Sequence, residues 1–476
     1  MIFNSFAYLL FLPVVFILYW FFTKKSLKLQ NVLLLLSSYL FYATWNWKFL
    51  FLLIFSTLLD YFTGLKMAGS KTRQNKRFWF WLSILVNLGF LGIFKYYNFF
   101  ITSFSEALGR FGVQAHLSTL QIILPVGISF YTFHGLSYVI DIYKNRIEPE
   151  KNFLDYAVFV CFFPLLVAGP IERATHLLPQ IKTKRTFSYA QAVDGLRQIL
   201  WGLFMKIVVA DNCAIVVNEV FKNQGAYNGP SLIIGAVLFA FQIYGDFAGY
   251  SNIALGSAKL FGIDLLKNFA FPYFSRDIAE FWRRWHISLS SWFKDYLYIP
   301  LGGSKGGKWT QVRNTLIIFV VSGFWHGANW TFIIWGLLNA LYIMPLVIFS
   351  LNRKNTNTVA EGRLLPNFTE FCQIIFTFAI TVIAWIFFRA GTVADAFDYV
   401  RRIFSLNNYG WPQTDSKPFI FIAALVIVEW FQRNKHHGLQ IDGLKNIVVR
   451  WSIYAVLILI ILIFGGNSDS FIYFQF

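Results

Sequence analysis

Charged residues are scarce in this sequence of 476 residues. Asp, Glu, Lys and Arg together make up 13%, whereas hydrophobic residues make up 57% and Phe, Trp and Tyr alone 20%. These proportions lie far outside those of an ordinary soluble domain and exclude a soluble enzyme. A disordered chain is excluded because it would need low hydrophobicity. An outer-membrane barrel is excluded because its strands would need strict alternation of apolar and polar residues, whereas the apolar residues here come in unbroken runs. A helical membrane protein with several spans remains.

Cysteine and acidic residues are also few. Cys161, Cys213 and Cys372 are far apart, with no C-x-x-C and no Cys/His cluster, so neither a disulfide framework nor a metal site is expected. The 23 acidic residues stand against 41 Lys and Arg, which gives a net charge of +18. Because the basic residues lie between apolar runs rather than on one polar face, they favour a positive-inside bias over nucleic-acid binding.

About eleven apolar windows approach or reach the length needed to cross a bilayer, roughly 17 to 25 residues. They predict an all-α multi-pass protein with one membrane domain over residues 1–476. The windows lie near residues 2–22, 30–45, 49–65, 78–96, 121–142, 191–219, 231–250, 331–351, 370–389, 417–432 and 449–465. Lysines and arginines follow the first and third windows, which predicts cytoplasmic loops there and an N-terminus outside the cytoplasm.

Residues 153–169 are a further apolar stretch that does not fit this alternation. A full crossing there would place Lys184 and Arg185 outside, against the charge bias. The stretch contains FPLLVAGP, whose proline and glycine residues oppose a continuous helix, and non-helical backbone at membrane depth must be buried in protein or line water. We therefore expect a re-entrant segment that enters and leaves on the cytoplasmic face.

The region from Tyr244 to Trp330 has many polar groups among aromatic residues, and such groups in a membrane protein mark functional sites by default. Asp246 and Asn252 follow an apolar span among small residues that permit close helix contact. They either support a site or bond neighbouring helices, and the sequence gives both interpretations equal weight.

A second polar segment follows at SRDIAEFWRRWHISLSSWFKDYLYIPLGG. Asp277 resembles a helix cap with Glu280 three residues on, and predicts one helix through about Lys294. On that helix Trp282, His286 and Leu289 would share one side. A helix with so many charged residues cannot span the membrane. We expect it to lie in the cytoplasmic interface or to dip partway into the bilayer.

His326 lies in the third polar segment, VSGFWHGANW, at a Gly-containing break between a short apolar run and the span that begins near Thr331. A histidine at the end of a broken helix can face a water-filled cavity, where it can take a proton from a hydroxyl and return it. A core histidine that bonds a carbonyl is the alternative. The second histidine at a polar break, His286, makes the two interpretations about equal, and Trp325 and Asn329 are supporting candidates.

Residues 302–308, GGSKGGK, match a nucleotide-binding loop by letter only. Trp309 stands where Ser or Thr would bind magnesium, and no strand precedes the segment, so a flexible turn is expected. Its Lys305 and Lys308 can meet lipid headgroups or an anionic ligand. His134, within an apolar window, is a weaker polar candidate.

Six segments together resemble the membrane-bound O-acyltransferase family, in particular the branch that includes the alginate O-acetylation membrane subunit. They are PVGISFYTFHGLSYVIDIY (125–143), FFPLLVAGPIERA (162–174), QIYGDFAGYSNIALG (242–256), FWRRWHISLSSWFKDYLYIPLGG (281–303), SGFWHGANW (322–330) and FIYFQF (471–476). The resemblance implies a ring of tilted helices around a funnel or tunnel in the cytoplasmic membrane. It also implies that His326 is catalytic and that His286 is a second functional histidine.

The resemblance further implies an acyl donor from the cytoplasm, most simply acetyl-CoA, and no other cofactor. The acetyl group would pass to an extracytoplasmic acetyltransferase-like or esterase-like partner protein, or to a polysaccharide. Because acetyl-CoA is polyanionic, Arg283, Arg284, Lys305 and Lys308 are expected to hold its phosphates through charge-assisted hydrogen bonds. Alginate, cellulose, another exopolysaccharide and peptidoglycan all remain open as acceptors.

A proton-coupled transporter, or a scaffold subunit of an exopolysaccharide export complex, is the alternative from another class. Broken helices with polar centres and buried histidines are also typical of carriers. A carrier predicts repeated halves with paired interruptions, and the sequence has none.

Overall fold

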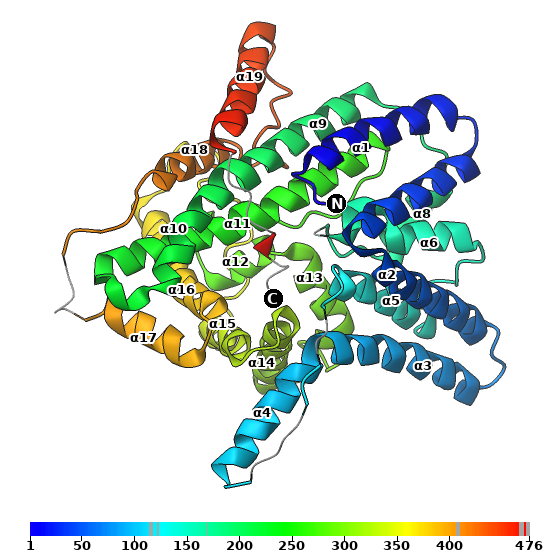
Figure 1. Ribbon diagram of the computed structural model, residues 1–476, viewed down its shortest axis with the longest axis horizontal. Coiled ribbons are helices and arrows are strands. Elements are labelled where there is room, and N and C mark those ends of the chain that lie inside the picture. Colours follow the sequence, from blue (N-terminus) through cyan, green and yellow to red (C-terminus); the bar gives the residue numbers. More distant parts are fainter. Residues whose placement is uncertain (114–117, 121–122, 168, 406–409, 466–470, 473–476) are drawn as a thin grey trace. The chain divides into compact units, whose positions relative to one another are not determined.

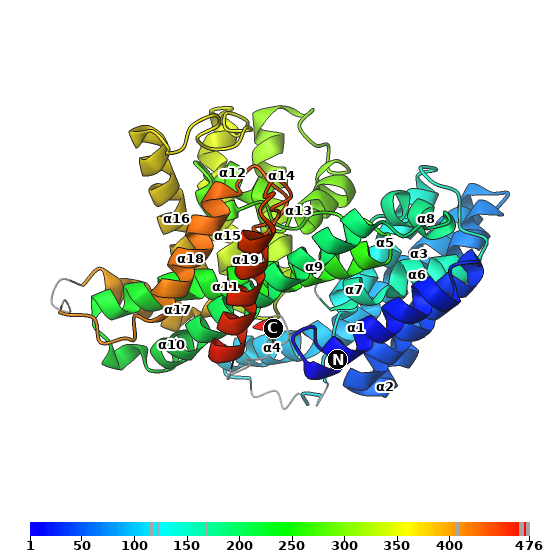
Figure 2. The same cartoon turned by 90° about the horizontal axis from the view of Figure 1, so that it is seen from above.

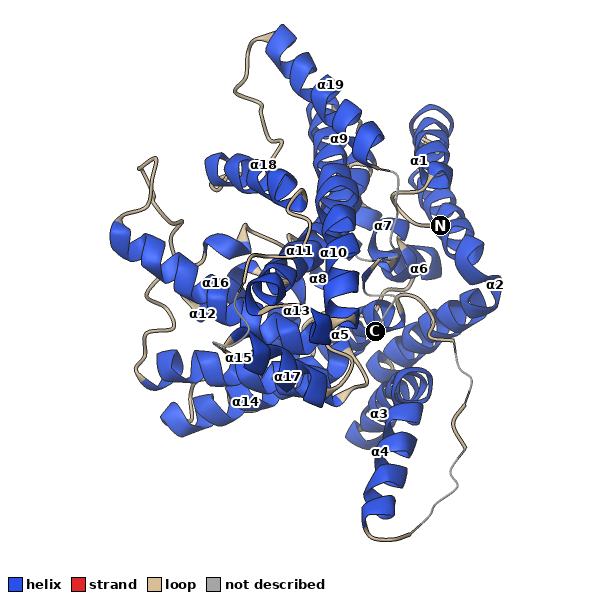
Figure 3. Ribbon diagram, turned by 60° about the vertical axis from the view of Figure 1, so that its left-hand side comes forward, coloured by secondary structure: helices blue, strands red, loops and turns tan. Residues whose placement is uncertain are grey.

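The computed structural model describes residues 1–476 except 114–117, 121–122, 168, 406–409, 466–470 and 473–476. Helices and the turns between them account for the described residues, with no strand among them (Figure 3). The chain forms two compact units: unit 1 comprises residues 1–192 and 257–266, and unit 2 comprises residues 193–256 and 267–476. The expectation of one membrane domain stays a prediction.

Unit 1 is built around α2, which consists of two helical stretches joined by extended backbone at Asn46 and packs against α3, α5 and α6 (Figure 1). Its helices are α1 (Phe6–Ile17), η1 (Leu18–Phe22), α2 (Leu27–Ala68), α3 (Arg73–Leu91), η2 (Gly92–Tyr96), α4 (Tyr97–Arg110), α5 (Ile128–Tyr143), α6 (Phe153–Cys161), α7 (Phe163–Leu166) and α8 (Ala174–Lys182). The chain passes between the units within α9 (Tyr189–Leu203) and α11 (Gly229–Leu260). The buried α5 thus lies against the longest helix of the unit.

Unit 2 carries the short helices α12 and α13 and several longer helices, among them α14, α15 and α16 (Figure 2). Its helices are η3 (Phe204–Ala210), α10 (Asp211–Lys222), η4 (Gln224–Ala226), η5 (Pro272–Phe274), α12 (Ile278–Arg284), α13 (Ile287–Phe293), η6 (Lys294–Tyr298), α14 (Gly307–His326), α15 (Trp330–Ile348), α16 (Phe368–Arg389), α17 (Val393–Ile403), α18 (Pro418–Phe431) and α19 (Ile447–Phe464). The helix α12 contacts α13, α15 and α16, while α14 packs along α15. These contacts surround the histidine-bearing segments.

Seven helices are long and apolar enough among the described residues to cross a membrane. The predicted windows fall on helices, but α2 takes two of them, separated by extended backbone at Asn46. Three other helical segments, Phe6–Phe22, α5 and α18, have fewer than 18 residues. Window 121–142 begins outside the described residues. The protein is a multi-pass helical membrane protein with several shorter helices beside its spans.

The stretch at residues 153–169 forms no spanning helix. The helix α6 ends at Cys161, and α7 has only four residues and begins with a proline in its first turn. Lys184 and Arg185 line the same pocket of unit 1 as Lys24 and Lys25. The two loops therefore lie on one side of unit 1, and the re-entrant course of the segment stays a prediction.

Candidate active site

His326 is the last residue of α14, and Gly327 ends the helix with extended backbone. The prediction of a helix break between α14 and α15 is confirmed. Near His326 the two helices meet at Gly323 and Gly336, where an added Cβ atom would lie 2.2 Å from the carbonyl oxygens of Phe332 and Phe319, respectively. This backbone contact fixes the end of α14 against α15.

The His326 imidazole is only 4% exposed and lies among aromatic rings. Ring centroids are 4.8 Å away for Trp325, 5.0 Å for Trp335 and 5.4 Å for Phe388. These rings come from α14, α15 and α16. The imidazole therefore lies in an aromatic cluster and is not at a polar surface.

His286 lies between α12 and α13, not within one continuous helix. Asp277 does cap α12, since its Oδ1 accepts the backbone N–H of Glu280 at 2.7 Å. However, α12 ends at Arg284, and His286 takes a left-handed conformation with φ +43°. The expectation of one helix through Lys294, with His286 on a shared helical face, was wrong. A left-handed non-glycine residue is strained, and such residues concentrate at functional sites.

Asn268 holds His286 in this conformation. The Asn268 backbone carbonyl accepts the N–H of Ile287 at 2.8 Å, and the side-chain Oδ1 lies 3.2 Å from His286 Nδ1. The same Oδ1 accepts the hydroxyl of Ser288 at 2.7 Å. Because an amide oxygen can only accept, Nδ1 of His286 carries the proton and Nε2 is left as an acceptor.

The Nε2 atom of His286 is buried and has no hydrogen-bond partner among the described residues. The Nδ2 amino group of Asn268 is in the same state. Burial lowers the pKa of His286 to about 3, so the imidazole is neutral at physiological pH. An acceptor nitrogen of His286 and the donor amide of Asn268 thus both lack a protein partner in the described part of the chain.

The two predicted histidines are brought together in unit 2. The centroids of the His286 and His326 rings are 6.4 Å apart, and the Trp325 ring lies 6.1 Å from that of His286. Asn329, by contrast, caps α15 by accepting the N–H of Thr331 at 3.1 Å, and its Nδ2 donates to the Gly391 carbonyl. Of the two supporting candidates in this segment, only Trp325 contacts both imidazoles.

Asp246 and Asn252 bond neighbouring helices. Asp246 is 2.8 Å from the ammonium of Lys206, which also lies 2.8 Å from Asp211, and all three are buried. The other Asp246 oxygen accepts the N–H of Ile472. Asn252 accepts from Gln198 at 3.0 Å. These contacts favour the structural interpretation of both residues.

The four residues expected to bind acyl-CoA fall into two pairs. Arg283 donates to the carbonyls of Asn352 and Asn355, and Arg284 is paired with Glu280 at 2.8 Å. Lys305 and Lys308 are exposed, and neither ammonium group has a hydrogen bond or ion pair within the described ranges. The two arginines fix loops, whereas the two lysines are available to an anion.

Two residues of these clusters, Asn268 and Lys206, were not identified from the sequence. Asn268 lies in a loop, LKNFAF, without a motif, and nothing local shows that it contacts His286. Lys206 did leave a signal, because it is a single cation inside an apolar window.

The family model of MBOAT, the membrane-bound O-acyltransferase family, matches residues 150–388, about half of the chain. Both histidines and Asn268 lie inside this range. The chain belongs to the membrane-bound O-acyltransferase family, and it is an acyltransferase.

Curated relatives extend this match over nearly the whole chain. The chain is 35% identical to the probable alginate O-acetylase AlgI of Pseudomonas putida, with all of both chains covered. Identity to the probable alginate O-acetylase AlgI of Pseudomonas aeruginosa is 38%, over 86% of this chain and 76% of that one. The peptidoglycan O-acetyltransferase of Helicobacter pylori is 32% identical, over 98% and 95%.

Proposed function

We propose that this protein takes an acetyl group from cytoplasmic acetyl-CoA and passes it across the cytoplasmic membrane for O-acetylation of an extracytoplasmic polysaccharide. The names of its relatives, alginate O-acetylase and peptidoglycan O-acetyltransferase, support an acetyl group and a polysaccharide acceptor. The observation that carries the chemistry is the pair of buried imidazoles 6.4 Å apart within the family-matched range.

His326 acts as the general base in this proposal. Its imidazole takes the proton from the acceptor hydroxyl as the oxygen attacks the thioester carbonyl carbon. A new C–O bond forms, the C–S bond breaks, and the imidazolium returns the proton to the departing thiolate. If a carrier protein intervenes, a group on that carrier replaces the first acceptor hydroxyl.

His286 and Asn268 orient the reacting groups. A neutral imidazole with a low pKa is a weak base, which suits His286 as a hydrogen-bond acceptor that aligns the hydroxyl rather than as the proton carrier. The amide Nδ2 of Asn268 is a donor that can polarise the thioester carbonyl. In this proposal His286 and Asn268, rather than Asp246 or Asn252, are the residues that support the site.

The donor enters from the cytoplasmic side, and the N-terminus lies outside, as the charge bias suggests. Lys305, on the exposed turn before α14, and Lys308, in the first turn of α14, are better placed to bind the phosphates than Arg283 and Arg284, whose guanidinium groups already donate to the protein. The acetyl group is then delivered either to an extracytoplasmic partner protein or directly to the polymer, and the chemistry at the histidines is the same in both cases.

The test is acetyl transfer by purified protein in proteoliposomes loaded with labelled acetyl-CoA and given polysaccharide on the other side. The His326→Gln variant should lose roughly 10²–10⁴-fold in rate, the usual contribution of general base catalysis. His436→Gln, a change at an exposed loop histidine, is the matched control and should keep the wild-type rate. Wild-type transfer by His326→Gln would refute the base role.

Donor binding is tested separately by reversing the two lysines. Lys305→Glu with Lys308→Glu should raise the KM for acetyl-CoA at least about tenfold while kcat stays close to wild type, because the phosphates lose two charge-assisted contacts. The exposed lysines Lys66 and Lys71, changed to Glu in the same way, serve as the control. An unchanged KM would remove these lysines from the donor site.

A further inference from the structure

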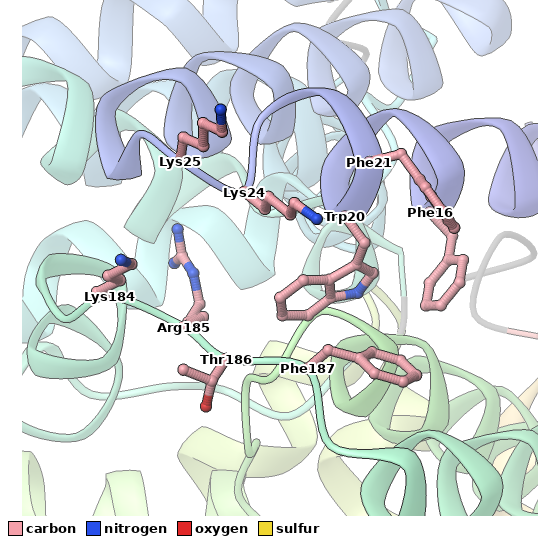
Figure 4. A pocket seen from close by; sticks show the side chains of 9 residues that line it. All are labelled: Phe16, Trp20, Phe21, Lys24, Lys25, Lys184, Arg185, Thr186 and Phe187. Atoms are coloured by element: carbon pink, nitrogen blue, oxygen red, sulfur yellow. The ribbon is translucent and has the colours of Figure 1, made fainter.

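A basic pocket of about 570 Å³ lies in unit 1, between the chain that follows η1 and the chain that follows α8 (Figure 4). Lys24 and Lys25 line it from the first segment, and Lys184 and Arg185 line it from the second. No acidic residue lines it. None of the three lysines has an ion pair with any described residue, so the pocket holds uncompensated positive charge.

Arg185 makes the basic side a built site rather than a chance group of surface lysines. It is only 6% exposed, and its guanidinium lies 5.7 Å from the Tyr19 ring. Its Nη2 donates to Asn31, whose Nδ2 donates in turn to Asp155 at 2.8 Å. The Nε and Nη1 atoms of Arg185 are buried without a partner in the described part of the chain. Arg185 is therefore a buried cation fixed at the basic side of the pocket.

The opposite side of the pocket is aromatic. Trp20 is fixed by a 2.8 Å hydrogen bond from its indole to the Leu260 carbonyl, and its ring lies 5.5 Å from that of Phe187. Phe16 also contacts Phe187, at 6.1 Å between centroids. Phe21 and Phe187 are 70% and 50% exposed. The ligand therefore meets an apolar wall next to four cations.

The pocket also lies at the end of an apolar helical segment. Phe6–Phe22 is apolar, and Lys24 and Lys25 follow it directly. Tryptophan beside lysines at the end of such a segment is typical of the boundary between lipid tails and headgroups. A ligand that matches both the basic side and the aromatic side of the pocket has a phosphate and an alkyl chain.

We propose that this pocket binds an anionic phospholipid, with its phosphate on Lys24, Lys25, Lys184 and Arg185 and an acyl chain along Phe21 and Phe187. A free phosphate or a nucleotide phosphate shares only the first half of this chemistry, because it leaves the aromatic wall uncovered. Basic pockets next to membrane helices bind anionic headgroups by the same means. The proposal does not depend on the acyl-transfer chemistry of unit 2.

The experiment measures binding of dioleoylphosphatidylglycerol to the purified full-length protein by native mass spectrometry, with dioleoylphosphatidylcholine as the zwitterionic comparison. Wild type should retain phosphatidylglycerol in preference to phosphatidylcholine. The variant with Lys24, Lys25 and Lys184 changed to Gln should bind phosphatidylglycerol about tenfold or more weakly, because three charges near the headgroup are lost. Arg185 is left intact since it also bonds Asn31.

The matched control changes three exposed lysines of unit 1 outside the pocket, Lys66, Lys71 and Lys151, to Gln. It has the same net charge as the pocket variant and should bind phosphatidylglycerol like wild type. Equal weakening in both variants would show a diffuse charge effect and overturn the proposal. Equal affinity of wild type for the two lipids would overturn it as well.

Changes in the aromatic wall, at Phe21 and Phe187, distinguish binding of a lipid from binding of a simple anion. Phe21→Ala with Phe187→Ala should weaken phosphatidylglycerol severalfold, because the acyl chain loses contact area. Inorganic phosphate and coenzyme A, at the same concentration as the lipid, should not displace it. Displacement by either, or no effect of the two Phe changes, would mean that the pocket recognises a phosphate alone.

Discussion

The two buried polar clusters of unit 2 differ in what their atoms contact. Around Lys206, one ammonium bridges two carboxylates at 2.8 Å, and the backbone N–H of Ile472 completes the second one. Around His286, a strained imidazole is held on one side by Asn268 while Nε2 and the Asn268 amino group lack partners in the described part of the chain. Polar groups that satisfy one another stabilise a fold, whereas polar groups held rigidly with atoms left over are suited to a substrate.

The largest expected effect sharpens this comparison at the histidines. His326→Ala should lower kcat roughly 10²–10⁴-fold, and adding His286→Ala should lower it little further, because residues that act as a unit are not additive. Acetyl transfer by the two single variants and the double variant measures this. A double variant whose loss equals the product of the two single losses would mean that the imidazoles act independently.

At the paired cluster the expected effect is on stability. Lys206→Met leaves Asp211 and Asp246 buried without their cation, which should cost about 3–5 kcal/mol of unfolding free energy. Unfolding in mixed micelles measures it, and the rate per folded molecule should stay near wild type.

The control for this change removes the whole cluster. Adding Asp211→Asn and Asp246→Asn to Lys206→Met should recover part of the lost stability, because no buried charge is then left unpaired. A Lys206→Met protein that is stable but inactive would instead assign this cluster to catalysis, and the contrast with the histidines would fail.

Asn268 is a positioning residue whose replacement should lower activity less than that of His326. Asn268→Ala frees the His286 ring and should reduce kcat by up to about 10²-fold. In Asn268→Asp a carboxylate faces Nδ1 and raises the pKa of His286, so the acidic limb of the pH–rate profile should move to higher pH. A profile unchanged by Asn268→Asp would show that Asn268 has only a structural role.

The low pKa of His286 also makes stability depend on pH. In the unfolded chain this histidine takes up a proton below about pH 6.5, whereas the folded protein does so only near pH 3. Stability should therefore fall as the pH is lowered through this range. Comparison with His286→Gln measures the contribution, because the variant should lose part of the acid sensitivity.

The smallest effect is expected at Asn329, whose side chain bonds the backbone groups of Thr331 and Gly391. Asn329→Ala removes the cap of α15 and should cost about 1 kcal/mol of stability, while Asn329→Asp keeps an acceptor and most of that stability. Thermal unfolding measures both. A large loss of rate in Asn329→Asp with stability unchanged would return this residue to the active site.

Hydrophobic patterns predicted the long helices well, because span length and apolar content are local properties. The windows at 231–250, 331–351 and 370–389 fall on α11, α15 and α16. Windows 30–45 and 49–65 fall on either side of the extended backbone at Asn46, where two helical stretches meet within α2. The helix α5 covers only part of window 121–142, because it begins at Ile128. Tertiary packing sets these ends.

The break at His286 could not be read from the sequence. Histidine is enriched among left-handed residues, but most histidines are not left-handed, and the segment around His286 has ordinary helix-forming residues. The conformation depends on Asn268, which is 18 residues earlier in the chain and contacts it only after folding. In the same way, Asp246 can be assigned a structural role only when the structure shows that it pairs with Lys206.

The contact between Gly323 and Gly336 limits how the space beside His326 can change. Because the two backbones already touch, α14 cannot approach α15 more closely, and a larger residue at either glycine would force them apart. In the proposed site, selectivity for acyl groups of different length should therefore change through the rings of Trp335 and Phe388, whose size can vary while the helix crossing, and with it the depth of the imidazole, stays constant.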